Sequence, residues 1–408
     1  MRRTTFLVSF AALGSAFLTV IPAFGEESFV PIIGWNNQFF PSYLLASSTI
    51  RHAEDDEQET DTDDDVVVLG DPQGVLGVKV VATEDDTPIE VTIECKEILD
   101  RTTFDGTLEH AGAEYDIYPR IRYHYKALAQ NKQSTPVSVT FTVKIGGDEP
   151  EVYTTTATVR SVNDCPFARV NPDGGITDMS YMFAAYVNEQ HPFIDKVLRE
   201  ALDDGVVSSF SGYQSGKTED VYRQVYALWN ALSERDVRYS SITKSVATNE
   251  TVYSQHVRLL DESINNGQAN CVDGAVLFAS LLRKIDIEPI LVSLPHHCYV
   301  AFYLDKEHTQ LVGLETTLLG AEMDENADCE LPGVTDVVDD EWQATNSWRT
   351  FCTAIESATT DLAANADKFD KDDPDYQLVR IKEARSDGVL PIAFDAASSF
   401  QQRTTQDD

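Results

Sequence analysis

The chain has 408 residues and a formal net charge of −37 at pH 7, from 31 basic and 68 acidic side chains. Such an acidic composition disfavours nucleic acid and anionic membranes as partners, although a polycation is an alternative partner. The length is typical of two domains rather than one.

The first 25 residues have the pattern of a signal peptide. Arg2 and Arg3 precede an apolar run from Phe6 to Ile21, and residues 23–25, Ala-Phe-Gly, offer small residues for cleavage. No later stretch is apolar over the about 20 residues that a membrane-spanning helix needs. We therefore expect an exported protein (periplasmic, cell-surface or extracellular) with no membrane span after cleavage.

Residues 26–65 are predicted to be an N-terminal segment followed by an acidic linker. The apolar part, QFFPSYLLASSTI, is expected to pack as a strand on a later domain, and residues 54–65 contain nine acids in twelve residues. Because such a run repels itself and buries no apolar surface, we expect a solvated linker. A calcium site is the alternative, but the run lacks the glycine with which a calcium loop turns.

Residues 66–165 are predicted to form a β-sandwich domain. Apolar residues alternate with polar ones in IEVTIEC (89–95) and in VSVTFTVKI (137–145). Short alternating strands without a helical stretch predict an antiparallel β-sandwich of Ig-like size. Cys95 faces inward and Cys165 follows the last strand, so the two are a plausible disulfide in an exported protein.

Residues 166–408 change to helical periodicity and are predicted to be an α+β domain with a C-terminal extension. We expect helices over 179–188, 192–205, 218–236 and 272–284, then strands in EPILVSL, HCYVAFYL and QLVGLETT, and finally a helix and a short strand within 346–390.

Cys271 in NCVDGAVLFASLLRK would lie in the first turn of its helix, where the partial positive charge of the helix end favours a thiolate. A base must then take the proton and return it to a leaving amine. In PHHCYVAFYLD, strand parity places Cys298 toward the core and His297 on the opposite face. His297, rather than His296, is therefore the predicted base.

An acid is needed to orient the imidazole. Asp305 shares the face of His297, but eight residues along a strand span about 26 Å, which excludes it. If the next strand forms a hairpin centred on Lys306, Glu315 is the direct cross-strand neighbour of His297, with the Cβ atoms about 5 Å apart. Glu315 is therefore the predicted third member.

A cysteine at a helix start, a histidine that opens a strand and an acid on the next strand resemble the papain-fold core of the transglutaminase-like superfamily, in its bacterial exported type. NCVDGAVLFASLLRKIDIEPILV, PHHCYVAFYLD and LVGLETTLLG carry the resemblance, and the superfamily core would cover 180–320. By this resemblance Cys271 is the nucleophile, His297 the general base and acid, and Glu315 the orienting acid. The superfamily usually has Asp in the third place, and a tryptophan often follows the histidine where this chain has Cys298.

The expected reaction is acyl transfer from an amide or peptide bond through a Cys271 thioester, without a cofactor or metal. Hydrolysis of a protein or peptide is favoured over crosslinking, because water is always present as an acceptor. The oxyanion hole would combine the backbone N–H of Cys271 with an upstream donor, Gln268 or Asn270. Asn270 is equally well explained as the helix N-cap, and the oligomeric state stays open.

Other interpretations remain for the cysteines. Cys271 could be a buried thiol, half of a disulfide, or a zinc ligand with His297 and Glu315, although no CxxC or HxxxH spacing supports zinc. Cys298 is expected to be a core thiol. Cys329 and Cys352 could pair, which would give two disulfides in all. The rival function is a non-catalytic surface or assembly module, in which Cys271 is inaccessible or disulfide-bonded.

Overall fold

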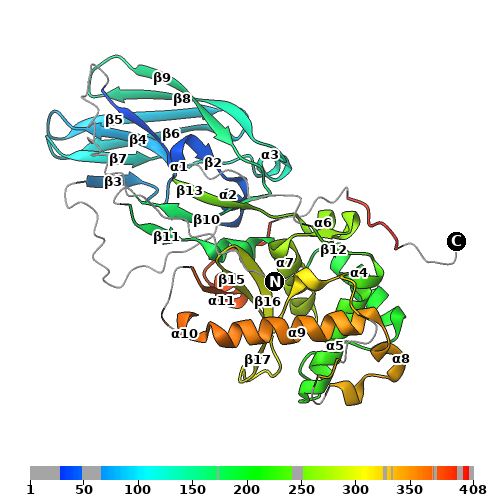
Figure 1. Ribbon diagram of the computed structural model, residues 1–408. Coiled ribbons are helices and arrows are strands. Elements are labelled where there is room, and N and C mark those ends of the chain that lie inside the picture. Colours follow the sequence, from blue (N-terminus) through cyan, green and yellow to red (C-terminus); the bar gives the residue numbers. More distant parts are fainter. Residues whose placement is uncertain are drawn as a thin grey trace, which may run out of the picture.

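The computed structural model describes residues 28–47, 66–171, 174–240, 251–324, 329–331, 334–369, 371, 375–392 and 398–403. The predicted signal peptide and the acidic run 54–65 lie outside these residues. Among the helices of the described ranges, none combines the length and the apolar character that crossing a membrane requires. The chain has a mixed α+β architecture with several sheets (Figure 1).

Two β-sheets share one apolar core in the N-terminal part of the chain (Figure 1). The first contains β1 (Val30–Ile33), β3 (Val66–Gly70), β4 (Leu76–Val81) and β7 (Glu114–Tyr118), in the order β1-β4-β7-β3. The second contains β2 (Gln38–Phe39), β5 (Thr87–Cys95), β6 (Leu99–Leu108), β8 (Thr135–Ile145) and β9 (Glu151–Val159), in the order β2-β9-β8-β5-β6. Buried residues of both sheets, such as Val78 and Phe141, fill the space between them.

The predicted strand periodicity is present, but the sheets are not wholly antiparallel. β3 pairs with β7 and β2 pairs with β9 in parallel, because each pair joins segments far apart in the chain rather than the arms of a hairpin. A six-residue helix, α3 (Tyr125–Gln130), also interrupts the strands. The N-terminal segment supplies β1, the turn α1 (Gly34–Asn37), β2 and α2 (Pro41–Ala46), so it adds a strand to each sheet. The run expected to be a strand is one only at Gln38–Phe39, and after Phe40 it continues as the helix α2.

The predicted disulfide between Cys95 and Cys165 is wrong. Both thiols are free and buried. Cys95 belongs to the core between the two sheets, whereas Cys165 on β10 (Asp164–Val170) belongs to the second, larger core. Strand parity identified Cys95 as inward-facing, but parity does not tell which core a neighbouring cysteine enters.

A small sheet joins the two parts of the molecule. It has the order β11-β10-β13 and contains β10, β11 (Ile176–Asp178) and β13 (Val252–His256). Two further strands, β12 (Arg238–Tyr239) and β14 (Gln268–Ala269), flank β13 in the chain and pair with each other in parallel. β14 leads directly into the helix that begins at Cys271.

The C-terminal part is built on an antiparallel sheet of order β17-β16-β15-β18. Its strands are β15 (Pro289–Leu294), β16 (His297–Tyr303), β17 (Leu311–Leu314) and β18 (Gln377–Arg380). The helices around it are η1 (Ser180–Tyr186), α4 (Pro192–Asp204), α5 (Thr218–Glu234), α6 (Leu260–Asn266), α7 (Cys271–Lys284), η2 (Thr316–Leu318), η3 (Thr335–Val337), α8 (Asp340–Gln343), α9 (Asn346–Ala364), α10 (Ala366–Phe369) and α11 (Ile381–Ser386).

Helices cover both faces of this sheet. α7 packs on the face that presents Val300 and Phe302, and α9 crosses the other face, where Ala358 packs against Tyr299 and Ala301 (Figure 1). The strand face of His297 is therefore a second buried face and not a solvent-exposed one. His297 reaches a partly exposed position because it is the first residue of β16, at the rim of the sheet.

Candidate active site

Cys271 is the first residue of α7 and is a free, partly exposed thiol. The preceding residue, Asn270, is the N-cap, and its Oδ1 accepts a hydrogen bond from Asp273 N at 2.9 Å. Asp273 Oδ2 in turn accepts from Asn270 N at 2.9 Å, which completes a capping box. The thiol thus lies beside the backbone N–H groups at the positive end of a well-capped helix.

His297 and Glu315 are hydrogen-bonded. His297 Nε2 lies 2.7 Å from Glu315 Oε2, and since an ionised carboxylate only accepts, the imidazole donates. Glu315 Oε1 accepts from Thr317 N at 3.0 Å and from Thr317 Oγ1 at 2.6 Å. Both oxygens of Glu315 are therefore fixed, one by His297 and one by Thr317, because Glu315 is the N-cap of η2.

The hairpin register differs from the prediction by two residues. β16 and β17 pair Val300 with Leu314 and Tyr303 with Leu311, so Glu315 lies just beyond the ladder and is not the direct cross-strand neighbour of His297. The shift arises in the turn, where the Asp305 carboxylate accepts hydrogen bonds from Thr309 and Gln310. A shift of two keeps the strand parity, and the Glu315 side chain covers the remaining distance.

The electrostatics of the site favour a charged imidazole. Hydrogen bonds with Cys271 and then with Glu315 raise the pKa of His297 to about 10, against the opposing effect of burial. Burial by itself would raise the pKa of Glu315, but the hydrogen bonds from His297 and Thr317 outweigh it and lower that pKa. His297 thus lies between two groups, each of which stabilises its protonated form.

Gly274 allows the acid and the cysteine to come together. A Cβ atom at this position would lie 2.7 Å from Thr316 Oγ1 and 2.9 Å from Thr316 Cβ. The glycine therefore lets η2, which begins directly after Glu315, pack against the first turn of α7. The sequence does not predict this role, because a glycine inside a helical pattern does not indicate which distant residue packs against it.

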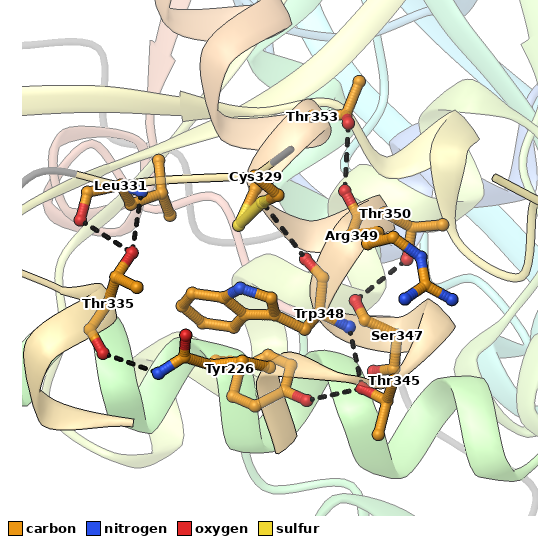
Figure 2. The surroundings of a disulfide bond; sticks show 12 residues. Tyr226, Cys329, Leu331, Thr335, Thr345, Ser347, Trp348, Arg349, Thr350 and Thr353 are labelled. Carbon is orange, nitrogen blue, oxygen red and sulfur yellow. Dashed lines mark hydrogen bonds between the residues drawn. A yellow bond between two sulfur atoms is a disulfide. The ribbon is translucent and has the colours of Figure 1, made fainter. Parts of the chain in front are cut away.

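Helix α9 holds Glu315 from the other side. Glu315 N donates to Ala354 O at 3.0 Å. Two residues earlier, Cys352 forms a disulfide with Cys329, which confirms the predicted pair. Figure 2 shows Trp348 next to Cys329, with Tyr226 on the other side of the Trp348 ring. Cys298 is free and buried, as predicted, so the six cysteines form one disulfide and not two.

The two oxyanion candidates have different surroundings. The side chain of Asn270 is already engaged, because its Oδ1 caps α7 and its Nδ2 donates to His256 O at 3.2 Å. Its role is that of the N-cap. Gln268 is exposed on β14 and lines a cavity of about 510 Å³ together with Tyr239, so it remains the upstream candidate.

Tyr239 on β12 is a neighbour of the site that the sequence did not predict. Burial raises its pKa, and the charges of Cys271 and Glu315 add to this effect. The side chain is 45% exposed and lines the same cavity as Gln268. Nothing in its local sequence points to this position, which depends on the parallel pairing of β12 with β14.

Asp273 is an acid in the first turn of α7, two residues from Cys271, where a carboxylate charge would oppose a thiolate. It is completely buried, and its Oδ2 lies 2.6 Å from Arg258 Nη1. Burial raises the pKa of this carboxyl, while hydrogen bonds with Asn270 and Arg258 act in the opposite direction. The carboxylate of Asp273 is therefore paired with Arg258, which offsets its charge near the thiol.

Among the described residues, no group of three or more His, Cys, Asp and Glu side chains has the arrangement of a metal site. The zinc alternative thus has no support from the geometry of this part of the chain.

Comparison of the sequence with models of known protein families gives no match, and comparison with curated proteins gives none either. The resemblance to the transglutaminase-like superfamily therefore stays a prediction.

Proposed function

We propose that this chain is a cysteine enzyme that transfers an acyl group from an amide or peptide bond through a Cys271 thioester. The observation that carries the proposal is the position of His297, whose Nε2 is hydrogen-bonded to Glu315 and whose pKa is raised by both Cys271 and Glu315. A nucleophile, a base within hydrogen-bond reach and a third group that orients the base form the arrangement that nucleophilic catalysis needs.

In this mechanism the Cys271 sulfur attacks the carbonyl carbon, and a C–S bond forms as the C–N bond breaks. His297 gives its proton to the departing amine. It then takes a proton from water, which attacks the thioester and releases the acid and the thiol. The backbone N–H of Cys271 would stabilise the oxyanion, with Gln268 as the upstream donor. Glu315 holds the imidazole and stabilises its positive charge.

The same proposal includes the assignment of the chain to the transglutaminase-like superfamily. It also includes an Ig-like fold for the N-terminal sheets, a papain-like fold for the C-terminal core, and export of the protein. Hydrolysis of a protein or peptide remains the favoured outcome. The residues that line the cavity beside Gln268 and Tyr239 do not include Cys271, His297 or Glu315, so the support for a substrate site comes from the triad itself. The rival non-catalytic module requires an inaccessible or disulfide-bonded Cys271, whereas this thiol is free and partly exposed.

The test is to incubate the mature protein with a complex peptide mixture and to follow three products by mass spectrometry. New peptide termini would indicate a peptidase, and conversion of side-chain amides to acids an amidase. Incorporation of an added fluorescent primary amine would indicate a crosslinker. Cys271→Ala should abolish whichever product appears. Glu307→Gln, which changes an exposed carboxylate in the β16–β17 turn, should leave it unchanged. Equal product from wild type and Cys271→Ala would refute the proposal.

A further inference from the structure

We infer that Asp273 and Arg258 form a positioning pair that fixes Cys271 and ties it, through the loop after β13, to the segment that joins β9 to β10. The inference rests on the proposed function, since it explains how the nucleophile is held. Neither residue touches the reacting atoms, and both act through the start of α7.

The Asp273 carboxylate holds this helix start by three contacts. Its Oδ1 accepts from Arg258 N at 2.7 Å, and its Oδ2 accepts from Arg258 Nη1 at 2.6 Å and from Asn270 N at 2.9 Å. Asn270 immediately precedes Cys271 in the chain. One completely buried carboxylate thus sets the backbone that carries both the thiol and the proposed oxyanion donor.

The pair also controls the charge near the thiol. A buried carboxylate two residues from Cys271 would disfavour a thiolate, and Arg258 cancels that charge. The other titratable groups that interact with Cys271 come from two elements: His297 and Cys298 of β16, and Tyr239 of β12. Glu315, the carboxylate of the proposed triad, is paired with His297. The charge of Asp273 is neutralised instead by Arg258, which lies outside the triad.

The loop that carries Arg258 is bound to the end of the N-terminal part. Val257 N donates to Asn163 O at 2.7 Å, and Asn163 Nδ2 donates to Val257 O at 2.8 Å. The neighbouring His256 Nδ1 lies 3.6 Å from Asp164 Oδ1. Asn163 follows β9, the strand next to β8 in the second sheet. The contacts therefore connect the segment between β9 and β10 to 256–258 and, through Arg258 and Asp273, to the residue before the nucleophile.

The test measures the alkylation rate of Cys271 by iodoacetamide from about pH 5 to about pH 9. Arg258→Gln removes the charge that neutralises the carboxylate, so the midpoint should move to higher pH. A midpoint that lies about one pH unit higher makes alkylation on its acidic side about tenfold slower. Asp273→Asn removes the negative charge of the carboxylate near the thiol, so the midpoint should move to lower pH. The double variant should return toward the wild-type midpoint. Arg283→Gln is the matched control, because it breaks an ion pair with Glu189 at the other end of α7.

Hydrogen exchange of the amides of 270–274 is the second readout and does not require a reactive thiol. Exchange there should be faster in Arg258→Gln and Asn163→Ala than in Arg283→Gln. Wild-type midpoints and wild-type exchange in the Arg258 and Asp273 variants would overturn the inference, even if their melting temperatures fall. Failure of wild-type Cys271 to react would contradict the proposed function instead. The hydrogen-exchange rates of the variants would then show whether Asp273 and Arg258 hold the start of α7.

Discussion

His297 Nε2 and Glu315 Oε2 lie 2.7 Å apart, although the β16–β17 ladder pairs neither residue with the other. The contact depends on three elements that meet at the rim of the sheet. β16 begins at His297, η2 is capped by Glu315, and α9 accepts the Glu315 backbone N–H at Ala354. The pair is thus held by tertiary packing and not by strand register.

Replacing Glu315 by Gln should lower the rate of the proposed reaction about 100-fold, the order that a properly held acid–base group contributes. Glutamine keeps the shape but loses the charge that raises the pKa of His297, so less of the histidine is protonated. The measurement is kcat on whichever peptide substrate the screen identifies, with Glu307→Gln as the control. An unchanged kcat would show that Glu315 has no orienting role.

Gly274→Ala should destabilise the protein by about 1 to 3 kcal/mol, because its Cβ would overlap Thr316 at 2.7 Å. It should also slow Cys271 alkylation, since η2 must move and Glu315 moves with it. Urea denaturation gives the free energy of unfolding, and mass spectrometry gives the alkylation rate of Cys271. Gly147→Ala is the control, because a Cβ at Gly147 meets no atom within 4 Å. Equal stability of the Gly274→Ala and Gly147→Ala variants would contradict the close packing of Thr316 against Gly274.

The stability of the protein should depend on the His297–Glu315 pair at both ends of the pH range. The pKa of His297 rises from 6.5 to about 10, so its contribution is complete below about 6.5 and is lost as the pH rises through about 10. The pKa of Glu315 is lowered, so its contribution is present above the ordinary value of 4.5 and is lost as the pH falls through the lowered one.

His297→Ala should therefore flatten the alkaline decline of the melting temperature. The control is His110→Ala, on an exposed histidine far along the chain in the N-terminal part. An alkaline limb that is the same in wild type and His297→Ala would mean that the pair does not contribute.

Alkylation of the denatured but unreduced protein should label Cys95, Cys165, Cys271 and Cys298 and spare Cys329 and Cys352. Cys352→Ser opens the disulfide, which joins residues 23 apart, and should cost about 3 kcal/mol by the loop-entropy relation. Peptide mapping and urea denaturation check the two statements. A disulfide-linked peptide that contains Cys95 and Cys165 would contradict the assignment of these two residues to separate cores.

Sequence patterns were sufficient where the signal is local. Strand alternation located β5 and β8, helical periodicity located α5 and α7, and parity selected His297 over its neighbour. The nomination of Glu315 rested on an assumed hairpin register, which is wrong by two residues. The error leaves Glu315 on the same face as His297, because parity repeats every two residues.

The rest depends on contacts between distant segments, which no local pattern encodes. The parallel pairing that brings Tyr239 to the site, the ion pair of Asp273 with Arg258 and the approach of Thr316 to Gly274 are of this kind. The assignment of Cys95 and Cys165 to different cores has the same origin. Apolar alternation tells that a side chain is buried but not what it is buried against.

The central claim is that His297 activates Cys271. The most direct test is native alkylation of wild type and His297→Ala with iodoacetamide from about pH 5 to about pH 9, mapped by mass spectrometry. We predict selective labelling of Cys271 on the acidic side of neutrality in wild type, with a lower rate and a midpoint at higher pH in the variant. An unlabelled Cys271, or the same rate in both proteins, would contradict the claim.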